Sequence, residues 1–268
     1  MEKLMHDAVL AAIKASNEIM QIYQDTGQDF GIEKKADNSP LTLADKAAHN
    51  CIIRHLSQTG IPILSEEGAI PPYEQRKSWH RLWLIDPLDG TKEFIKKNGE
   101  FTVNIALVED NKPLLGVILA PAIGIIYIGL VGFGAWKGEV AKPFLSGCPT
   151  NIVRLNGKDN ERSQQLGEQF TIAVSRSHLT PETESYIKLM QQKYGDVRLI
   201  SSGSSLKMCL VAEGVANVYP RFGPTMEWDT AAGDAIARAA GCQVVDAQND
   251  LPLNYNKPDL HNPWFIVK

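Results

Sequence analysis

The feature that most constrains this chain is the run DPLDGT at residues 86–91. It follows the apolar segment 81–85, which predicts a buried strand, and it brings Asp86 and Asp89 close together in the sequence. Two neighbouring carboxylates repel each other and are costly to remove from water, so a fold keeps them where a cation lies between them. Asp, Pro and Gly are also common turn residues, and a simple loop is the alternative interpretation.

The same run suits magnesium and phosphate. Mg²⁺ prefers oxygen ligands and usually shares them with substrate phosphates. Gly90 and Thr91 are suited to a tight turn whose backbone N–H groups face an anion. The sequence therefore predicts metal-assisted phosphate chemistry, with Mg²⁺ as the cofactor.

Further acids occur where strands are expected to end and helices to begin. Glu66 follows the apolar run 61–64, and Asp229 opens an Ala-rich segment that predicts a helix through Ala240. Each acid alone has an ordinary explanation, as a solvated loop charge or as a helix-start acid favoured by the macrodipole. Together they place acids at the positions where a layered α/β protein gathers its functional groups.

The spacing between Thr42 and Asp45 indicates the start of a helix. Asp45 lies three residues after Thr42, which predicts a capping box at the start of a helix over residues 44–56. A purely structural role is therefore one reading of this acid, and a place at the catalytic centre is the other.

The motifs in combination resemble the inositol monophosphatase superfamily, which are Mg²⁺-dependent, Li⁺-sensitive phosphomonoesterases. They follow the family's order and extend over most of the chain, as residues 37–45, 65–67, 86–91 and 228–233. The resemblance implies an α+β fold, a layered αβαβα sandwich. It also implies an N-terminal subdomain at residues 1–150 with most metal ligands, and a C-terminal subdomain at residues 151–268 with the nucleotide-recognition residues and the last ligand.

Further segments are similar to the CysQ-type 3'(2'),5'-bisphosphate nucleotidases of that superfamily, namely 86–107, 175–178, 203–207 and 219–225. This resemblance implies hydrolysis of the 3'-phosphate of adenosine 3',5'-bisphosphate to AMP. It implies the same reaction on 3'-phosphoadenylyl sulfate to give adenylyl sulfate, with a role in sulfur assimilation and nucleotide recycling.

The resemblance also assigns the metal ligands. It implies that one Mg²⁺ is held by Glu66, Asp86 and the carbonyl of Leu88. A second ion would be held by Asp86, Asp89 and Asp229, with two or three ions in total and Li⁺ as an inhibitor. Glu66 and Thr91 are expected to orient the attacking water and accept its proton, with Asp45 supporting Thr91.

The substrate residues follow in the same way. By resemblance His178, Ser204, Lys207 and Arg221 contact the nucleotide. The sequence alone leaves structural alternatives for them, such as a solvated helix position for Lys207 and a surface turn for Arg221. The remaining expected substrate contacts are Glu66, Leu88, Asp89, Gly90, Thr91 and Asp229.

Three other functions compete with this one. The first is hydrolysis of an inositol or sugar phosphate by the same metal site. The second is a haloacid-dehalogenase-type phosphatase with a nucleophilic Asp in a DxDGT motif, although here two residues, not one, separate Asp86 from Asp89. The third is a catalytically silent nucleotide-binding protein.

Composition limits the partners. A net charge of −4 without a basic run argues against long nucleic acids, so a small nucleotide bisphosphate is the expected partner. The four cysteines lack a CxxC pair and are expected to be reduced, which favours a cytoplasmic location. Residues 1–23 predict a charged amphipathic helix and no integral membrane segment, with peripheral contact at the cytoplasmic face of the inner membrane left open. A monomer and a homodimer both remain open.

The order of expected elements predicts a mixed sheet with helices on its faces. Helices are expected at 2–24 and 43–57, then a hairpin from 101–108 and 114–120, then a polar domain junction at 137–169. After the junction, strands expected near 171–175, 197–201, 215–219 and 242–246 alternate with helices near 181–193, 204–213 and 227–240.

Overall fold

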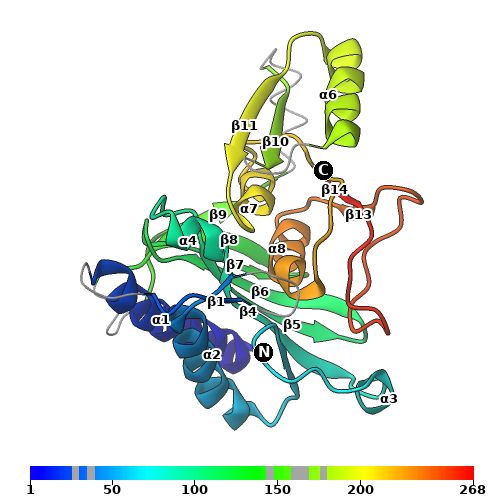
Figure 1. Ribbon diagram of the computed structural model, residues 1–268. Coiled ribbons are helices and arrows are strands. Elements are labelled where there is room, and N and C mark those ends of the chain that lie inside the picture. The colour runs from blue at the N-terminus through cyan, green and yellow to red at the C-terminus, as the bar shows by residue number, and fades with distance from the viewer. Residues whose placement is uncertain (26–29, 35–39, 143–147, 158–168, 176–179) are drawn as a thin grey trace.

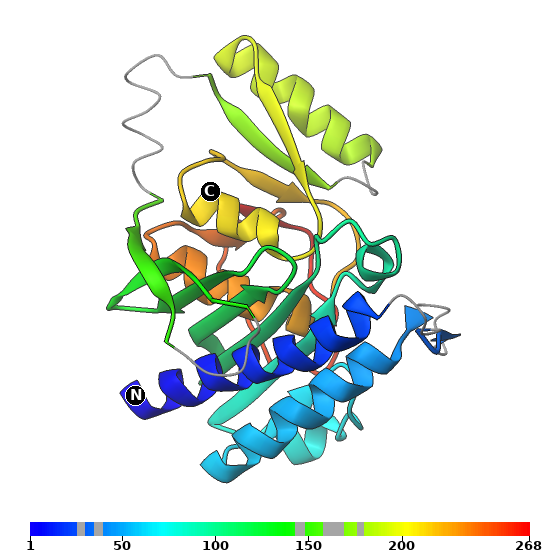
Figure 2. The ribbon, with the colours of Figure 1, turned by 90° about the vertical axis from the view of Figure 1, so that its left-hand side faces the viewer.

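The computed structural model describes residues 1–25, 30–34, 40–142, 148–157, 169–175 and 180–268. They form stacked layers in the order helix, sheet, helix, sheet, helix (Figures 1 and 2). This arrangement confirms the αβαβα sandwich expected from the sequence. The division into subdomains at residue 150 stays a prediction.

The larger sheet has seven strands in sequential order, and every neighbouring pair is antiparallel except the parallel first pair. The strands are β3 (Ile63–Ser65), β4 (Arg81–Asp89), β5 (Thr102–Glu109), β6 (Lys112–Ala120), β7 (Ile125–Leu130), β8 (Gly134–Glu139) and β9 (Thr150–Leu155).

Alternate residues of this sheet enter two different cores. On one face, Trp83 and Ile85 of β4 pack with helices α1 (Glu2–Gln24) and α2 (Leu43–Leu56). On the other face, Leu82 and Leu84 pack with helices α7 (Leu206–Ala212) and α8 (Glu227–Ala239). A sheet buried on both faces requires apolar residues at successive positions, which is why its strands read as continuous apolar runs.

Two glycines bring α8 unusually close to the sheet. Gly116 of β6 and Gly129 of β7 are register partners on neighbouring strands. A Cβ on Gly116 would lie 2.1 Å from the Ala232 carbonyl oxygen, and a Cβ on Gly129 would lie 2.5 Å from the Ile236 Cα. The missing side chains therefore set the depth at which α8 rests against the sheet.

The smaller sheet layer is mixed. Strands β10 (Thr171–Ser175) and β11 (Arg198–Ser202) are parallel, while β14 (Phe265–Val267) pairs antiparallel with β12 (Tyr219–Arg221) and with β13 (Val244–Asp246). A parallel bridge between Ile172 and Val218 joins the two groups. Helix α6 (Pro181–Tyr194) packs Ile187 against this layer.

The remaining described elements are short. They are β1 (Glu33–Lys34), β2 (Pro40–Leu41), the 3-10 turn η1 (Ser57–Thr59), α3 (Tyr73–Arg76) and α4 (Thr91–Ile95).

Several expected boundaries are wrong. The junction expected at 137–169 contains β9, which continues the larger sheet by pairing with β8. The strand expected at 215–219 begins only at Tyr219, because the turn after α7 runs through Gly214 at φ +78°. Helix α7 begins at Leu206 and not at Ser204, because Ser204 has φ +44°, which no right-handed helix accommodates.

Other expectations are confirmed. Helix α1 has the expected bounds, and the expected hairpin is formed by β5 and β6 around Asp110 and Asn111, both at positive φ. None of the four cysteines forms a disulfide. Among the described residues, no helix combines the length and the apolar character needed to cross a membrane.

Candidate metal and substrate site

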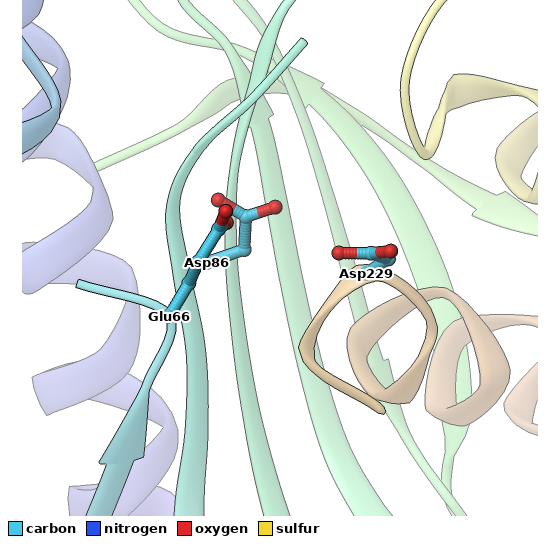
Figure 3. A group of neighbouring side chains, drawn as sticks. All are labelled: Glu66, Asp86 and Asp229. Carbon is cyan, nitrogen blue, oxygen red and sulfur yellow. The ribbon is translucent and has the colours of Figure 1, made fainter. Parts of the chain in front are cut away.

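Three carboxylates from separate elements converge at the edge of the larger sheet. Glu66 directly follows β3, Asp86 lies in β4, and Asp229 lies in the first turn of α8. One carboxylate oxygen from each lies within 4.8 Å of the other two (Figure 3). The parallel pairing of β3 with β4 brings Glu66 and Asp86 to the same edge, and the close seat of α8 on Gly116 brings Asp229 to them.

The sequence around Pro87 breaks the strand where the acids lie. The register between β4 and β5 shifts between Asp86 and Asp89, so Pro87 and Leu88 form an irregularity in the ladder. Proline has no N–H to donate there, and the Leu88 N–H instead donates to Asp86 Oδ1 at 3.0 Å. The DPLD spacing therefore bends the strand end and fixes the orientation of Asp86.

The cluster is electrostatically strained in the absence of a cation. Burial raises the pKa of Asp86 well above its ordinary value, and the charges of Glu66, Asp89 and Asp229 raise it further. Burial likewise raises the pKa of Asp229, and it raises that of Asp89 to about 6. Buried carboxylates that repel one another and offer only oxygen ligands fit a hard divalent cation such as Mg²⁺.

Thr91 and Asp45 form a second part of the site. Thr91 Oγ1 donates to Asp45 Oδ1 at 3.1 Å, and the other Asp45 oxygen accepts the Thr42 N–H at 2.7 Å. The Ala44 N–H donates to Thr42 Oγ1 at 3.2 Å, which completes the expected capping box. Asp45 is 1 % exposed, so the two readings of this residue hold together: one oxygen caps α2, and the other orients Thr91.

A buried polar network extends from Asp89 along β5. Asn104 Nδ2 donates to Asp89 Oδ2 at 3.4 Å, and Asn104 Oδ1 accepts the Ser205 hydroxyl at 2.9 Å. Thr102 Oγ1 lies 2.8 Å from Ser205 Oγ and donates to Ser204 Oγ at 3.2 Å. The network thus ties a predicted metal ligand to the turn that precedes α7.

One cavity joins the acids to the cations. It lies among the end of β4, the start of α8, and the segments around α7 and β12. The sequence-predicted residues that line it are Asp89, Gly90, Ser204, Lys207, Arg221 and Asp229.

Lys207 is nearly inaccessible to solvent. It is 4 % exposed, and its Nζ donates to the Ser202 and Ser204 carbonyl oxygens at 3.0 and 2.6 Å. Burial lowers the pKa of Lys207 to about 8, while the charge of Asp89 opposes this shift. A buried ammonium at the wall of a cavity is suited to pair with an anion.

Arg221 provides a second cation in the same cavity. Its Nη2 donates to the Pro224 carbonyl oxygen at 3.1 Å. Its Nε is buried and makes no hydrogen bond to any residue in the described ranges. A buried donor without an acceptor destabilises a protein, so this N–H fits a site in which a bound ligand supplies the acceptor.

The structure brings most of the predicted site residues together, but it does not describe all of them. The structure brings Glu66, Asp86, Asp229 and Asp89 into one electrostatic group, with Leu88 and Thr91 beside them. His178 lies outside the described residues, so its expected contact with the nucleotide stays a prediction.

Among the site residues to which the sequence analysis gave no role are Lys92, Thr102 and Asn104. Lys92 lines the cavity, and the signal for it was a basic side chain directly after the DPLDGT run. Thr102 and Asn104 are both 0 % exposed in β5. Their signal was a pair of polar residues two positions apart in an otherwise apolar run, which places them on one face of a strand.

Comparison with known proteins agrees with the fold. The model of the inositol monophosphatase family matches residues 1–264, so the chain belongs to the inositol monophosphatase family. Within it, the chain is 46% identical over 259 residues to the 3'(2'),5'-bisphosphate nucleotidase CysQ of Escherichia coli K12, covering 96% of both chains. It is 32% identical to the CysQ nucleotidase of Haemophilus influenzae, covering 99% of this chain and 93% of that protein.

Solved structures give the same picture. CysQ from Bacteroides thetaiotaomicron superimposes with a TM-score of 0.85 at 49% identity, covering 100% of this chain and 97% of that one. An inositol monophosphatase from Thermotoga maritima superimposes with a TM-score of 0.72 at 23% identity, covering 100% of this chain and 92% of that one, which shows the shared fold alone.

Proposed function

We propose that the chain is a Mg²⁺-dependent bisphosphate nucleotidase that removes the 3'-phosphate of adenosine 3',5'-bisphosphate and of 3'-phosphoadenylyl sulfate. The observation that carries this proposal is a single cavity lined by Asp89 and Asp229 and also by Lys207 and Arg221. A substrate with two separated phosphates can place one at the acids, through metal, and the other at the cations. The similarity to CysQ nucleotidases over nearly the full chain supports the same assignment.

The ligands for the cation are Glu66, Asp86, Asp89 and Asp229, together with the Leu88 carbonyl oxygen. Mg²⁺ held there supplies a Lewis acid that stabilises charge on the phosphoryl oxygens and lowers the pKa of a water molecule. Two ions, or three, are part of the proposal, because four carboxylates provide more ligands than one octahedral Mg²⁺ usually takes from protein. Li⁺ is expected to inhibit by competing for this set.

The attacking water is oriented by Thr91 and Glu66, with Asp45 supporting Thr91. The Thr91 hydroxyl is held by Asp45 at 3.1 Å, and Thr42 holds the other oxygen of Asp45 through its N–H at 2.7 Å and its hydroxyl at 2.5 Å. This chain of hydrogen bonds fixes the direction of the Thr91 oxygen, which together with Glu66 orients the water for in-line attack and accepts its proton. Positioning of this kind provides much of the catalysis in phosphoryl transfer, where the protein supplies little covalent chemistry.

The phosphate that is not hydrolysed is proposed to bind to Lys207, Arg221 and Ser204. The unsatisfied Nε of Arg221 and the buried Nζ of Lys207 offer donors to the same cavity. His178 is proposed to contact the nucleotide, on the strength of the resemblance alone. A cytoplasmic location belongs to the same proposal, and four cysteines that form no disulfide are consistent with it.

Isotope labelling tests the proposed reaction. When the reaction is run in H₂¹⁸O with Mg²⁺, we expect one labelled oxygen in each released phosphate and an unlabelled nucleotide product identified as 5'-AMP. Label in the nucleotide, or 3'-AMP as the product, would contradict direct attack of water on the 3'-phosphorus. A trapped phosphorylated Asp would point instead to the haloacid-dehalogenase reaction, which membership of the inositol monophosphatase family already disfavours.

Inositol or sugar phosphates are the second candidate substrates. The same metal site would serve them, and the family name is consistent with it. Lys207 and Arg221 weigh against these esters as the main substrates, since a monophosphate leaves both side chains without a second phosphate to bind.

A further inference from the structure

A carboxylate contacts the cavity wall formed by residues 202–205. Glu100, between α4 and β5, accepts a hydrogen bond from the Gly203 backbone N–H through its Oε2 at 2.9 Å. The contact is close, because a Cβ on Gly203 would lie 2.7 Å from the Glu100 carbonyl oxygen. Gly203 lines the cavity, whereas Glu100 is not among the described residues that do. Glu100 therefore contacts the wall without being part of the cavity lining.

The wall has a conformation that needs support. Ser204 has φ +44°, a left-handed conformation that is uncommon for residues other than glycine. Lys207 Nζ binds the carbonyl oxygens of Ser202 and Ser204, on either side of Gly203. Glu100 holds the N–H of Gly203 itself, so the peptide groups of this turn are fixed by one cation and one anion.

Glu100 also acts on Lys207 through its charge. The charges of Asp89, Glu93 and Glu100 favour the protonated form of Lys207, against the burial that lowers its pKa to about 8. Glu100 thus supplies the turn with a hydrogen-bond acceptor and supplies Lys207 with a nearby negative charge.

We propose that Glu100 is a positioning residue that selects for a second phosphate on the substrate. By holding the Gly203 N–H, it sets the turn that, with Lys207, receives the phosphate that is not hydrolysed. This inference rests on the proposed function, because it needs a substrate with two phosphates. It predicts that a neutral acceptor at position 100 suffices, since the turn requires a hydrogen bond at that place.

Two substitutions separate the hydrogen bond from the charge. Glu100→Gln keeps a carbonyl oxygen that can accept the Gly203 N–H, and Glu100→Ala removes it. Each is assayed with Mg²⁺ on adenosine 3',5'-bisphosphate and on 3'-AMP, which lacks the 5'-phosphate. For Glu100→Ala we expect KM for the bisphosphate to rise roughly ten- to a hundredfold, the usual size of a lost hydrogen bond to a charged group. The kcat for the bisphosphate and the KM for 3'-AMP should both stay within about threefold.

The conservative variant provides the rescue. Glu100→Gln should keep KM for the bisphosphate within about threefold of the unmodified enzyme. Equal losses on both substrates, or a Glu100→Gln variant as impaired as Glu100→Ala, would overturn the proposal.

Amide hydrogen exchange at Gly203 gives a reading independent of turnover. Exchange should be slow in the unmodified chain and in Glu100→Gln, and fast in Glu100→Ala. Unchanged exchange in Glu100→Ala would also overturn the positioning role. If the unmodified enzyme itself shows no preference for the bisphosphate, the proposed function fails, and that result is visible before any variant is compared.

Discussion

Thr91 Oγ1 donates a hydrogen bond to Asp45 Oδ1 across 3.1 Å, joining residues that are 46 positions apart in the chain. Asp45 is fixed in turn by the Thr42 backbone N–H at the start of α2. The orientation of the Thr91 hydroxyl therefore depends on how a helix of the outer layer begins.

Removing this hydroxyl should slow turnover without unfolding the chain. We expect Thr91→Val to lower kcat by about 10²–10⁴-fold, the usual contribution of a positioned proton acceptor. Thr150→Val, on exposed β9, is the matched control and should keep full activity. Steady-state kinetics on adenosine 3',5'-bisphosphate measures both, and a Thr91→Val enzyme with ordinary kcat would remove Thr91 from the proton pathway.

Asp89→Asn should have opposite effects on activity and on stability. The pKa of Asp89 is raised by burial to about 6, above its unfolded value of 3.8. A raised folded pKa destabilises the metal-free protein at pH values above about 6, and this cost disappears as the pH falls from 6 to 4. At pH 7.5 without metal, Asp89→Asn should therefore raise the free energy of unfolding, by up to about 3 kcal/mol.

In the presence of Mg²⁺ the same variant should release phosphate at least about 10³-fold more slowly, because it removes a charge that holds the cation. Urea unfolding with and without Mg²⁺, alongside the assay, measures the pair of effects. A variant that is active, or one that is less stable than the unmodified protein without metal, disagrees with the place given to Asp89.

The activity on the bisphosphate should decline in alkaline solution. The pKa of Lys207 is lowered by burial to about 8, so its ammonium loses its charge as the pH rises through that value. The kcat/KM for adenosine 3',5'-bisphosphate should fall over this range, because kcat/KM reports groups of the free enzyme. The kcat/KM for 3'-AMP should not fall in this pH range. If it falls equally for both substrates, the titrating group is not Lys207.

A buried polar cluster around Arg76 and Asn256 should control stability. Asn256 Oδ1 accepts a hydrogen bond from Arg76 Nη1 at 2.9 Å, and Asn256 Nδ2 donates to the Arg76 carbonyl oxygen at 2.8 Å. Arg76 is 2 % exposed, so Asn256→Ala leaves one of its donors buried without this partner. We expect the free energy of unfolding to fall by about 2–4 kcal/mol.

Urea denaturation measures this loss. Gln58→Ala, which removes one exposed hydrogen bond at 3.3 Å, should change the free energy of unfolding by less than about 0.5 kcal/mol. Similar values for the two variants would show that the Arg76 cluster contributes nothing particular.

The close seat of α8 gives a further prediction. A Cβ at position 116 would lie 2.1 Å from the Ala232 carbonyl oxygen, so Gly116→Ala must move α8 and Asp229 with it. We expect a loss of about 1–3 kcal/mol in the free energy of unfolding and a weaker affinity for Mg²⁺. Gly138→Ala, whose nearest contact would be 3.2 Å, should lose less and should bind Mg²⁺ normally. An unchanged affinity for Mg²⁺ in Gly116→Ala would show that the close packing of α8 on the sheet does not position the metal ligands.

The local motifs made much of this site predictable from the sequence. The DPLDGT run, the Thr42–Asp45 spacing and the acids after strand-like runs each carry a short-range signal, and the structure places all of them at one sheet edge. The start of α7 was harder to predict, because Ser204 has a positive φ in a turn held by Lys207 and Glu100, and no local pattern reveals these contacts.

The long-range packing was not predictable in the same way. Gly116 and Gly129 read as ordinary interruptions of strands, and only the structure shows that they accommodate α8. Strand β9 was hidden because five of its six residues are exposed and its apolar residues do not alternate regularly with polar ones, which is the pattern by which a half-buried strand is recognised.

The proposed function is tested most directly by the rate of phosphate release from adenosine 3',5'-bisphosphate and from inositol 1-phosphate, each with Mg²⁺ and with a chelator. We expect fast release from the nucleotide only when Mg²⁺ is present, little release from the inositol ester, and loss of the preference for the nucleotide in Lys207→Ala. Faster release from the inositol ester, or release from the nucleotide that persists in the chelator, would contradict the proposed function.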